Sequence, residues 1–300
     1  MKLPEDHEPE VAQLAERLLA WFVEHRQPEA AYAVALSGGV DSAVVAQAVA
    51  LSGCPAVAVT ATSASVSAVE RSDASQLAAR MGLAHHWIEP NELDDPAYQR
   101  NDLRRCYFCK SRLYSAIAQR FPRHQIVSGT NHDDLGDYRP GLEAAAESGV
   151  KAPLAELGIG KNQVRQLAHY WQLGVADKPA SPCLASRIAY GVAVTPERLQ
   201  RIEKAEQLLR DLGWHEFRVR LHADEVARLE VPPQSIAQLA AVDVRMRVVA
   251  ELKQLGFRYV TLDLEGFRSG SLNPVFQILN SSQALAPLPP GEVEPKRGRA

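Results

Sequence analysis

The chain contains 300 residues, of which 46% are hydrophobic and 23% are charged, and its formal net charge is −3. This length and apolar content predict one main domain with a sizeable core and a second, smaller domain. The slightly acidic balance argues against a surface that attracts nucleic acid, and no apolar stretch reaches the roughly 20 residues of a membrane span. Because residues 1–6 are too acidic for a signal peptide, we expect a cytoplasmic protein without membrane or nucleic-acid partners.

The longer, N-terminal part of the chain alternates between helix and strand patterns. A leading amphipathic helix is expected over residues 9–25, where apolar residues recur at helical spacing. The expected strands lie at 31–36, 56–60, 84–88 and 125–128, and the expected helices at 42–52, 67–81, 107–120 and 161–172. Because strands that alternate with helices are joined by right-handed crossovers, this pattern predicts an α/β fold with a parallel sheet covered on both faces.

The sequence changes character after residue 190. Thr195 and Pro196 are a typical N-cap and first residue of a helix. The expected elements are a helix from there to about 212, a strand at 217–221, a helix over 233–255 and a strand at 258–262. We therefore predict a main domain at 1–190, a smaller α+β domain for substrate binding or oligomerisation at 191–282, and a disordered tail at 283–300.

The most informative segment is residues 37–42, Ser-Gly-Gly-Val-Asp-Ser, which lies between an expected strand and an expected helix. Its glycines let the backbone approach an anion, its serines add hydroxyl donors, and the helix directs its positive end to the same place. The string is neither a P-loop nor a dinucleotide-binding fingerprint, and it resembles the PP-loop of ATP pyrophosphatases. The alternative is a glycine turn that only connects the two elements. The residues predicted to bind ATP here are Ser37, Gly38, Gly39, Asp41 and Ser42, with Asp41 holding Mg²⁺ or orienting the loop.

Further polar residues follow the second and fourth expected strands. In a parallel sheet, ligands bind at the carboxyl ends of the strands. By analogy with such folds, the end of the second strand offers backbone groups to adenine. Paired carboxylates after the fourth strand suit Mg²⁺ beside phosphates, although a polar turn with an Asx cap is the alternative. The residues assigned to this edge are Thr60 and Ala61 for adenine, Gly129 and Thr130 for the nucleotide, and Asp133 and Asp134 for Mg²⁺.

Four cysteines occur in the chain, and in the cytoplasm they are not expected to form disulfides. Cys106 and Cys109 form a Cys-x-x-Cys pair among basic residues that favour thiolates, and Cys183 lies in a proline-rich loop. Three thiolates suit a [4Fe-4S] cluster with one iron left open. A zinc ion with a fourth ligand and a set of unrelated buried or redox thiols are the alternatives. Cys54 is expected to be a small buried residue.

Five motifs spread over the chain carry a joint resemblance. They are residues 37–42, 105–110, 129–134 with 137–141, 181–187 and 266–273. Together they resemble the LarE family of ATP-dependent sulfur transferases, over about residues 10–280. The resemblance implies a PP-loop domain of the adenine nucleotide α-hydrolase-like (HUP) type, followed by a smaller α+β domain. It also implies a homo-oligomer.

The resemblance implies a step in making the nickel-pincer nucleotide cofactor. In this family, ATP adenylates a carboxylate of pyridinium-3,5-dicarboxylate mononucleotide, pyrophosphate leaves, and sulfur displaces AMP to give a thiocarboxylate. Adenylation is needed because a free carboxylate is a poor acyl donor. The PP-loop and Mg²⁺ would neutralise the charge that develops on pyrophosphate.

The sulfur source divides the family. Cys183 matches the cysteine that gives up its own sulfur in one-cysteine members, and this sacrificial route is the second choice here. Members with the additional Cys-x-x-Cys pair hold a [4Fe-4S] cluster whose open iron can carry sulfide. Because the pair is present, the resemblance favours Cys106, Cys109 and Cys183 as cluster ligands and sulfide or a sulfur-donor system as partner.

The resemblance also carries over further residues of the site. Ser186, Arg187 and Arg268 match positions near the phosphate and carboxylates of the substrate, and the planar fork of arginine suits both groups. Glu203 and Asp224 are weaker matches for acidic site residues. The predicted catalytic set is Cys183, Asp41, Ser186 and Arg187.

Two other classes of protein share some of these features. A tRNA-thiolating PP-loop enzyme would use the same chemistry on a base, but the acidic charge and the lack of an RNA-binding module argue against it. An ATP-binding regulatory protein would bind the nucleotide without catalysis. Pyrophosphate release separates this class from an enzyme.

Overall fold

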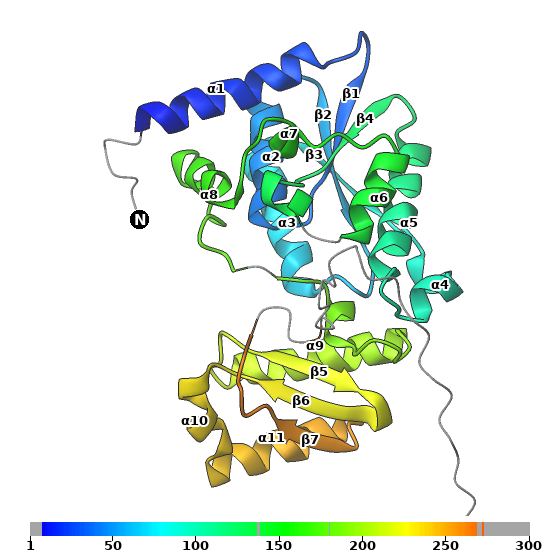
Figure 1. Cartoon of the computed structure of the whole chain (residues 1–300), viewed down its shortest axis with the longest axis vertical. Helices are drawn as coiled ribbons and strands as arrows, with labels where there is room; N and C mark the ends of the chain where they lie inside the picture. Colours follow the sequence, from blue (N-terminus) through cyan, green and yellow to red (C-terminus); the bar gives the residue numbers. More distant parts are fainter. Residues whose placement is uncertain (1–7, 137–138, 180, 269–271, 273–300) are drawn as a thin grey trace, which may run out of the picture.

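The computed structural model describes residues 8–136, 139–179, 181–268 and 272, and it contains two units, each with its own sheet (Figure 1). The sheet of the first unit has the strand order β3-β2-β1-β4, and all its pairings are parallel. Its strands are β1 (Ala31–Ala35), β2 (Ala56–Ala61), β3 (Ala84–Ile88) and β4 (His124–Val127). The helices of this unit are α1 (Glu8–Glu24), α2 (Val40–Leu51), α3 (Ala68–Arg80), α4 (Pro96–Gln99), α5 (Arg105–Arg120), α6 (Pro140–Glu147), α7 (Pro153–Glu156) and α8 (Lys161–Tyr170). The predicted α/β fold with a parallel sheet is confirmed.

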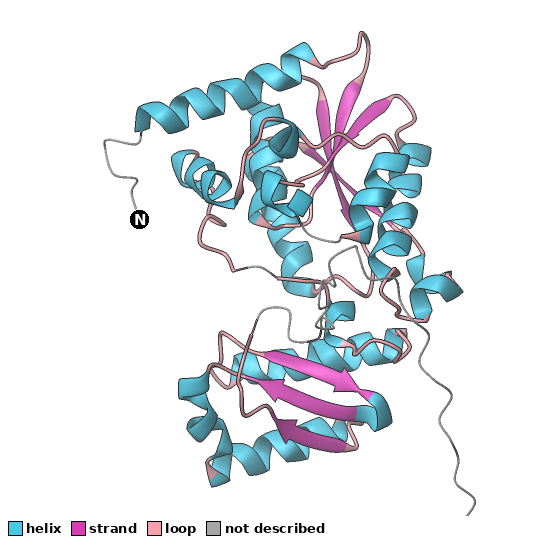
Figure 2. Ribbon diagram, viewed as in Figure 1, coloured by secondary structure: helices cyan, strands magenta, loops and turns pink. Residues whose placement is uncertain are grey.

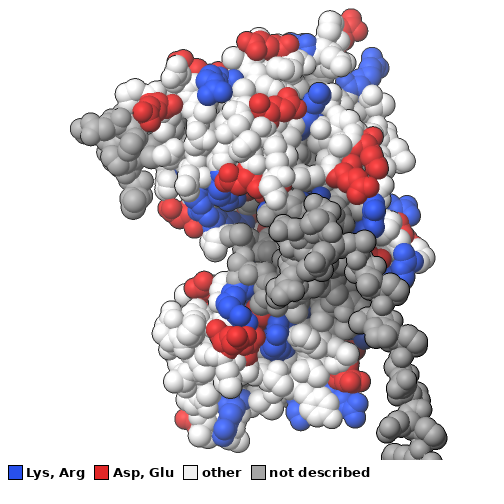
Figure 3. Space-filling view, in the orientation of Figure 1, with Lys and Arg blue, Asp and Glu red and all other residues white. Residues whose placement is uncertain are grey.

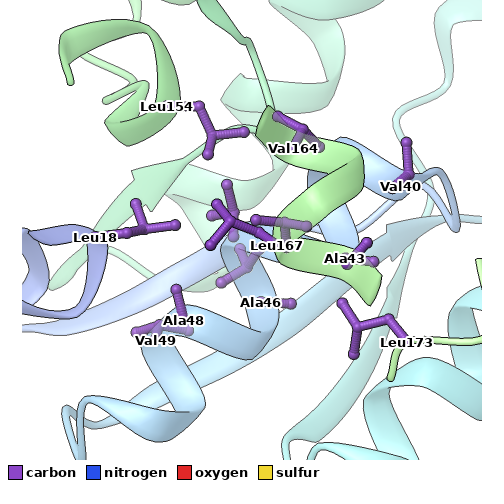
Figure 4. Packing of buried hydrophobic residues seen from close by; sticks show 14 of the residues in the cluster. Leu18, Val40, Ala43, Ala46, Ala48, Val49, Leu154, Val164, Leu167 and Leu173 are labelled. Atoms are coloured by element: carbon purple, nitrogen blue, oxygen red, sulfur yellow. The ribbon is translucent and has the colours of Figure 1, made fainter. Parts of the chain in front are cut away.

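Alternate residues of β1 show how this sheet is covered on both faces. Tyr32 and Val34 are buried in a core formed with α1, α2, α3 and α8, whereas Ala33 is buried in a separate core with α5 and α6. The period of two along a strand produces this division, because successive side chains point to opposite faces. Figure 4 shows the first core, in which Val164 and Leu167 of α8 lie close to the apolar side chains of α2. Helix α2 is therefore held in place along its length, and its N-terminus is fixed at the carboxyl edge of the sheet.

The second unit packs a three-stranded sheet on helices (Figure 2). Its strands are β5 (Arg218–His222), β6 (Val226–Glu230) and β7 (Tyr259–Leu262), with β5 and β6 antiparallel and β6 and β7 parallel. Helix α9 (Pro196–Asp211) begins where the sequence predicts, because the Thr195 hydroxyl accepts a hydrogen bond from the amide of Arg198 at 3.3 Å. The apolar faces of β5 and β6 share one core with α9 and α11 (Val242–Gln254).

Two expectations for the second unit are wrong. The helix expected over 233–255 is interrupted, because Ala241 has extended backbone angles (φ −56°, ψ 142°) that separate α10 (Ile236–Ala240) from α11. Strand β6 was not predicted. Its sequence, Val-Ala-Arg-Leu-Glu, is short and carries two charges, and its pairing with β5 and β7 is what defines it as a strand.

The segment after Cys183 connects the two units. Leu184 and Ile188 are buried in the second core, while the Leu184 amide donates to the Ser65 carbonyl of the first unit at 2.8 Å. The side-chain amide of Asn101 donates to the carbonyls of Ala189 and Val192 at 2.9 Å each. The domain limits at 190 and 282 stay predictions, and the predicted tail at 283–300 lies outside the described residues. No described helix is both long enough and apolar enough to cross a lipid bilayer.

Candidate functional site

The turn at residues 37–39 joins β1 to α2 and has the geometry expected of a phosphate-binding loop. Gly38 has φ +79°, and a Cβ at this position would lie 2.8 Å from the carbonyl oxygen of Glu70. Gly39 is the N-cap of α2. The Ser42 hydroxyl donates to the Gly39 carbonyl at 3.0 Å and accepts from the Ser37 amide at 3.2 Å. The loop is therefore braced by its own serines at a helix N-terminus, where anions are favoured.

Gly129 follows β4 and lies directly against the first turn of α2. A Cβ on this residue would be 2.5 Å from the amide nitrogen of Ser42 and 2.8 Å from the carbonyl carbon of Asp41. The close approach of two backbone segments explains the glycine. It also joins the predicted nucleotide residues after β4 to the loop at 37–42.

We expect Gly129→Ala to lower stability by about 1–3 kcal/mol, because backbone atoms must move to admit the methyl group. The same movement would displace the loop at 37–42 and so remove ATP turnover. Gly136→Ala is the matched control, since a Cβ there meets nothing within 4 Å. Thermal denaturation and AMP formation check both variants, and equal behaviour of the two would contradict the expectation.

Asp41 lies between two residues from distant parts of the chain. Its carboxylate forms an ion pair with the ammonium of Lys161, the first residue of α8, and accepts a hydrogen bond from the side-chain amide of Asn131 at 3.1 Å. Lys161 is missing from the sequence-based site, because 120 residues separate it from Asp41. The pair places a positive and a negative group at the N-terminus of α2. This arrangement can both orient the loop and offer a cation to phosphate oxygens.

A second lysine contacts the same loop. The ammonium of Lys178 donates to the Gly38 carbonyl at 2.9 Å and pairs with Asp73 of α3 at 2.7 Å. Sequence reasoning also missed Lys178, although it assigned the stretch 177–183 to a loop leading to Cys183. On the face drawn in Figure 3, acidic and basic side chains are interspersed and form no extended basic surface. The positive groups at the loop are thus local to it.

The carboxylates predicted to bind Mg²⁺ have partners within the protein. Asp133 accepts a hydrogen bond from the amide of Lys161 at 2.8 Å and so serves the N-terminus of α8. Asp134 pairs with Arg139 and accepts from the Asn131 amide at 3.1 Å. These contacts leave further acceptor positions on both carboxylates, and magnesium ligation by Asp133 and Asp134 stays a prediction.

The residues assigned to adenine lie in β2. The Thr60 hydroxyl is buried and donates to the Leu36 carbonyl at 2.7 Å, so the His85 imidazole at 2.8 Å must donate to it through Nε2. Burial, together with the charge of neighbouring His86, lowers the pKa of His85, which keeps this ring neutral. The hydroxyl of Thr60 is therefore occupied by its hydrogen bonds with Leu36 and His85. Adenine recognition by the backbone of Thr60 and Ala61 stays a prediction.

The three candidate cysteine ligands lie on two segments that influence each other electrostatically. Cys106 and Cys109 are on the first turn of α5, exposed and half-buried respectively, and Cys183 is a half-buried residue just before a short 3₁₀ turn (Leu184–Arg187). Burial and then the charge of Cys183 raise the pKa of Cys109 to about 12. Within the described ranges, no group of three or more histidine, cysteine or acidic residues is arranged to hold a metal ion. Three cysteine sulfurs are a chemically suitable donor set for soft metals, although these side chains are not arranged as a formed metal site.

In reduced protein stripped of metal, we expect alkylation at about pH 8 to label Cys106 at least about tenfold faster than Cys109, because thiolate is the nucleophile. The rate at Cys109 should rise roughly tenfold per pH unit until its pKa is approached. Mass spectrometry of the labelled peptides measures both rates. Similar labelling rates of Cys106 and Cys109 at about pH 8 would contradict the raised pKa of Cys109.

Buried Arg105 connects the two segments that carry these cysteines. Arg105 donates to the Ala185 carbonyl at 2.9 Å and to the Asn101 side chain at 2.6 Å, which ties the start of α5 to the turn after Cys183. The thiolate charges of Cys183 and Cys106 raise the pKa of Arg105 in spite of the opposing effect of burial. The guanidinium therefore stays charged between the two segments.

Arg187 and Ser186 both contact the backbone of Cys183. Arg187 donates to the carbonyls of Pro182 and Cys183, the latter at 3.1 Å, and pairs with buried Glu206 at 3.0 Å. The Ser186 hydroxyl donates to the Cys183 carbonyl at 2.7 Å. Both predicted substrate residues thus position Cys183, and their contact with substrate stays a prediction.

The remaining candidates lie elsewhere. Arg268 is half exposed and pairs with Glu265, and part of the motif around it lies outside the described residues, as do residues 137–138. Glu203 accepts a hydrogen bond from the Ala68 amide at the N-terminus of α3, at 2.7 Å, so it joins the two units. Asp224 is exposed on a turn with φ +56°.

Comparisons with known proteins agree with the nucleotide loop and extend beyond it. The family model described as asparagine synthase matches residues 14–101, which include the loop at 37–42. An uncharacterised protein of Synechocystis sp. is 46% identical over 81% of this chain and 91% of its own length. The pyridinium-3,5-bisthiocarboxylic acid mononucleotide synthase of Lactiplantibacillus plantarum is 36% identical over 80% of this chain and 88% of its own length. An uncharacterised protein of Methanocaldococcus jannaschii is 29% identical over 55% of this chain and 64% of its own. The chain belongs to the LarE family of ATP-dependent sulfur transferases, enzymes of the PP-loop type.

Proposed function

We propose that this enzyme converts a carboxylate of pyridinium-3,5-dicarboxylate mononucleotide into a thiocarboxylate, at the expense of ATP. The relative from L. plantarum, whose name describes synthesis of a pyridinium bisthiocarboxylic acid mononucleotide, supports this substrate. The observation that carries the proposal is the contact of Lys178 with the loop at 37–42, five residues before Cys183. It connects an adenylating loop to a sulfur-bearing segment, which is the combination that the reaction needs.

The first half of the reaction is adenylation. A carboxylate oxygen of the substrate attacks the α-phosphorus of ATP, the bond to the β-phosphate oxygen breaks, and pyrophosphate leaves. The N-terminus of α2 and the ammonium groups of Lys161 and Lys178 lie where negative charge grows on the leaving group. Asp41 keeps Lys161 in position and offers an oxygen ligand for the magnesium that accompanies ATP.

The second half transfers sulfur. A sulfur nucleophile forms a bond to the carbonyl carbon of the acyl-adenylate, and the bond to the AMP oxygen breaks. Ser186 and Arg187 donate to the carbonyl of Cys183, so the backbone that carries the thiol is held in place. The guanidinium of Arg105 joins the start of α5 to the turn after Cys183, so a cation lies between the two cysteine segments.

We further propose that Cys106, Cys109 and Cys183 hold a [4Fe-4S] cluster. Three sulfur donors from two segments, brought together by Arg105, support this set. When bound, such a cluster supplies an iron site that can carry sulfide for repeated turnover. Burial that raises the pKa of Cys109 means that loading must displace a proton from this thiol.

Two measurements test these proposals separately. Pyrophosphate release by purified protein should require the pyridinium nucleotide as well as ATP and Mg²⁺, and release without the nucleotide would contradict the substrate assignment. Anaerobic analysis should find about four iron and four sulfide per chain, lost in Cys106→Ala, Cys109→Ala or Cys183→Ala. Stoichiometric zinc without iron would overturn the cluster. A single turnover that leaves dehydroalanine at position 183 would instead establish the sacrificial route.

A further inference from the structure

Lys178 occupies a position that links two parts of the site. It belongs to the segment between α8 and Cys183, and its ammonium is divided between the Gly38 carbonyl of the nucleotide loop and the Asp73 carboxylate of α3. Its side chain is only 22% exposed, and that of Asp73 is 30% exposed. Partial burial makes such a charged contact stronger than one at a fully solvated surface.

The rest of the segment is attached by backbone contacts on either side of Lys178. Arg165 of α8 donates to the carbonyls of Ala176 and Lys178, at 2.6 and 3.3 Å. Beyond Cys183, the Leu184 amide donates to the Ser65 carbonyl. Between these two attachments, the side chain of Lys178 connects the segment to the nucleotide loop and α3.

We propose that Lys178 is a positioning residue through which a triphosphate at the loop changes the attachment of the Cys183 segment. The inference rests on the proposed placement of the triphosphate at residues 37–42. A triphosphate carries several negative charges, whereas Asp73 carries one, so the ammonium turns from Asp73 toward the phosphates. The segment then exchanges its contact with α3 for one with the phosphates, and Cys183 gains freedom to move relative to α3 when ATP is in place. The two states differ in a defined contact, as any ligand-driven change requires.

Hydrogen–deuterium exchange of the peptide over residues 175–187 measures this coupling without turnover. A non-hydrolysable ATP analogue bridged at the α–β position, added with Mg²⁺ at saturation, should speed exchange of the wild-type peptide by about threefold or more. Lys178→Met should exchange quickly with or without the analogue. Lys178→Arg keeps the charge and should retain most of the response. Lys204→Met, at an exposed position on α9, is the control and should behave as the wild type.

Asp73→Ala gives an independent test, because it removes the carboxylate but keeps the lysine. Without nucleotide, its exchange rate should approach that of the analogue-bound wild type. The proposal is overturned if the wild-type peptide does not respond to the analogue, if Lys178→Met responds as the wild type does, or if Asp73→Ala exchanges at the resting wild-type rate. An enzyme that shows the coupling but makes no thiocarboxylate would contradict the proposed substrate and leave the role of Lys178 standing.

Discussion

Asp41→Asn is expected to reduce the formation of AMP and pyrophosphate by roughly a hundredfold or more while the protein stays folded. The asparagine keeps the size of the side chain and its contact with Asn131, but it removes the charge that pairs with Lys161. The ammonium of Lys161 is then no longer held at the N-terminus of α2, and one oxygen ligand for magnesium is weakened. Both changes raise the energy of the transition state for pyrophosphate release.

The control for this variant is Asp211→Asn. Asp211 is an exposed carboxylate at the end of α9 that accepts a hydrogen bond from Gln207. Its loss should leave AMP formation unchanged. Turnover is followed as AMP and pyrophosphate, and folding by circular dichroism. Activity of Asp41→Asn within a few-fold of wild type would refute the assigned role of this carboxylate.

Arg187→Met is expected to lower the free energy of unfolding by about 3–5 kcal/mol, because it leaves a buried carboxylate without its cation. The side chains of Arg187 and Glu206 are 4% and 5% exposed, so water cannot replace the lost partner. The variant also loses the hydrogen bonds that fix the carbonyls of Pro182 and Cys183. Denaturant unfolding measures the stability, and thiocarboxylate formation measures the effect on Cys183.

The double variant Arg187→Met/Glu206→Leu separates these two effects. Since a buried ion pair replaced by apolar side chains is often neutral for stability, the double variant should recover most of the lost free energy. Sulfur transfer should not recover, because the carbonyls of Pro182 and Cys183 still lack the Arg187 guanidinium that donates to both. Recovery of both properties together would show that Arg187 serves stability alone.

Local sequence patterns predicted much of the first unit. Strand β3 has the expected limits, β1 and β2 differ from expectation by one residue at an end, and β4 is shifted by one residue at both ends. Strands β1 and β2 are apolar, and all four strands lie between helices, so short-range signals agree with the fold. The loop at 37–42 could also be predicted from the sequence, because its serines form hydrogen bonds with residues only three to five positions away.

Interactions between residues far apart in the chain could not be predicted from local sequence patterns. Lys161 and Lys178 have the sequence surroundings of ordinary surface lysines, and they reach the loop only because α8 packs along α2. In the same way, the hydrogen bond from the Lys161 amide to the Asp133 carboxylate joins residues 28 positions apart and has no local signal in the sequence. The break at Ala241 depends on tertiary packing, since helix-forming residues lie on both sides of it.

Sulfur transfer to an activated carboxylate is the central step of the proposed reaction. Its most direct test is anaerobic incubation of the enzyme with ATP, Mg²⁺, sulfide and pyridinium-3,5-dicarboxylate mononucleotide, followed by mass spectrometry of the nucleotide and quantification of AMP. We predict that one oxygen of the substrate is exchanged for sulfur with an equal amount of AMP formed. Formation of AMP with no sulfur in the pyridinium nucleotide, or sulfur found only in added tRNA, would contradict the account.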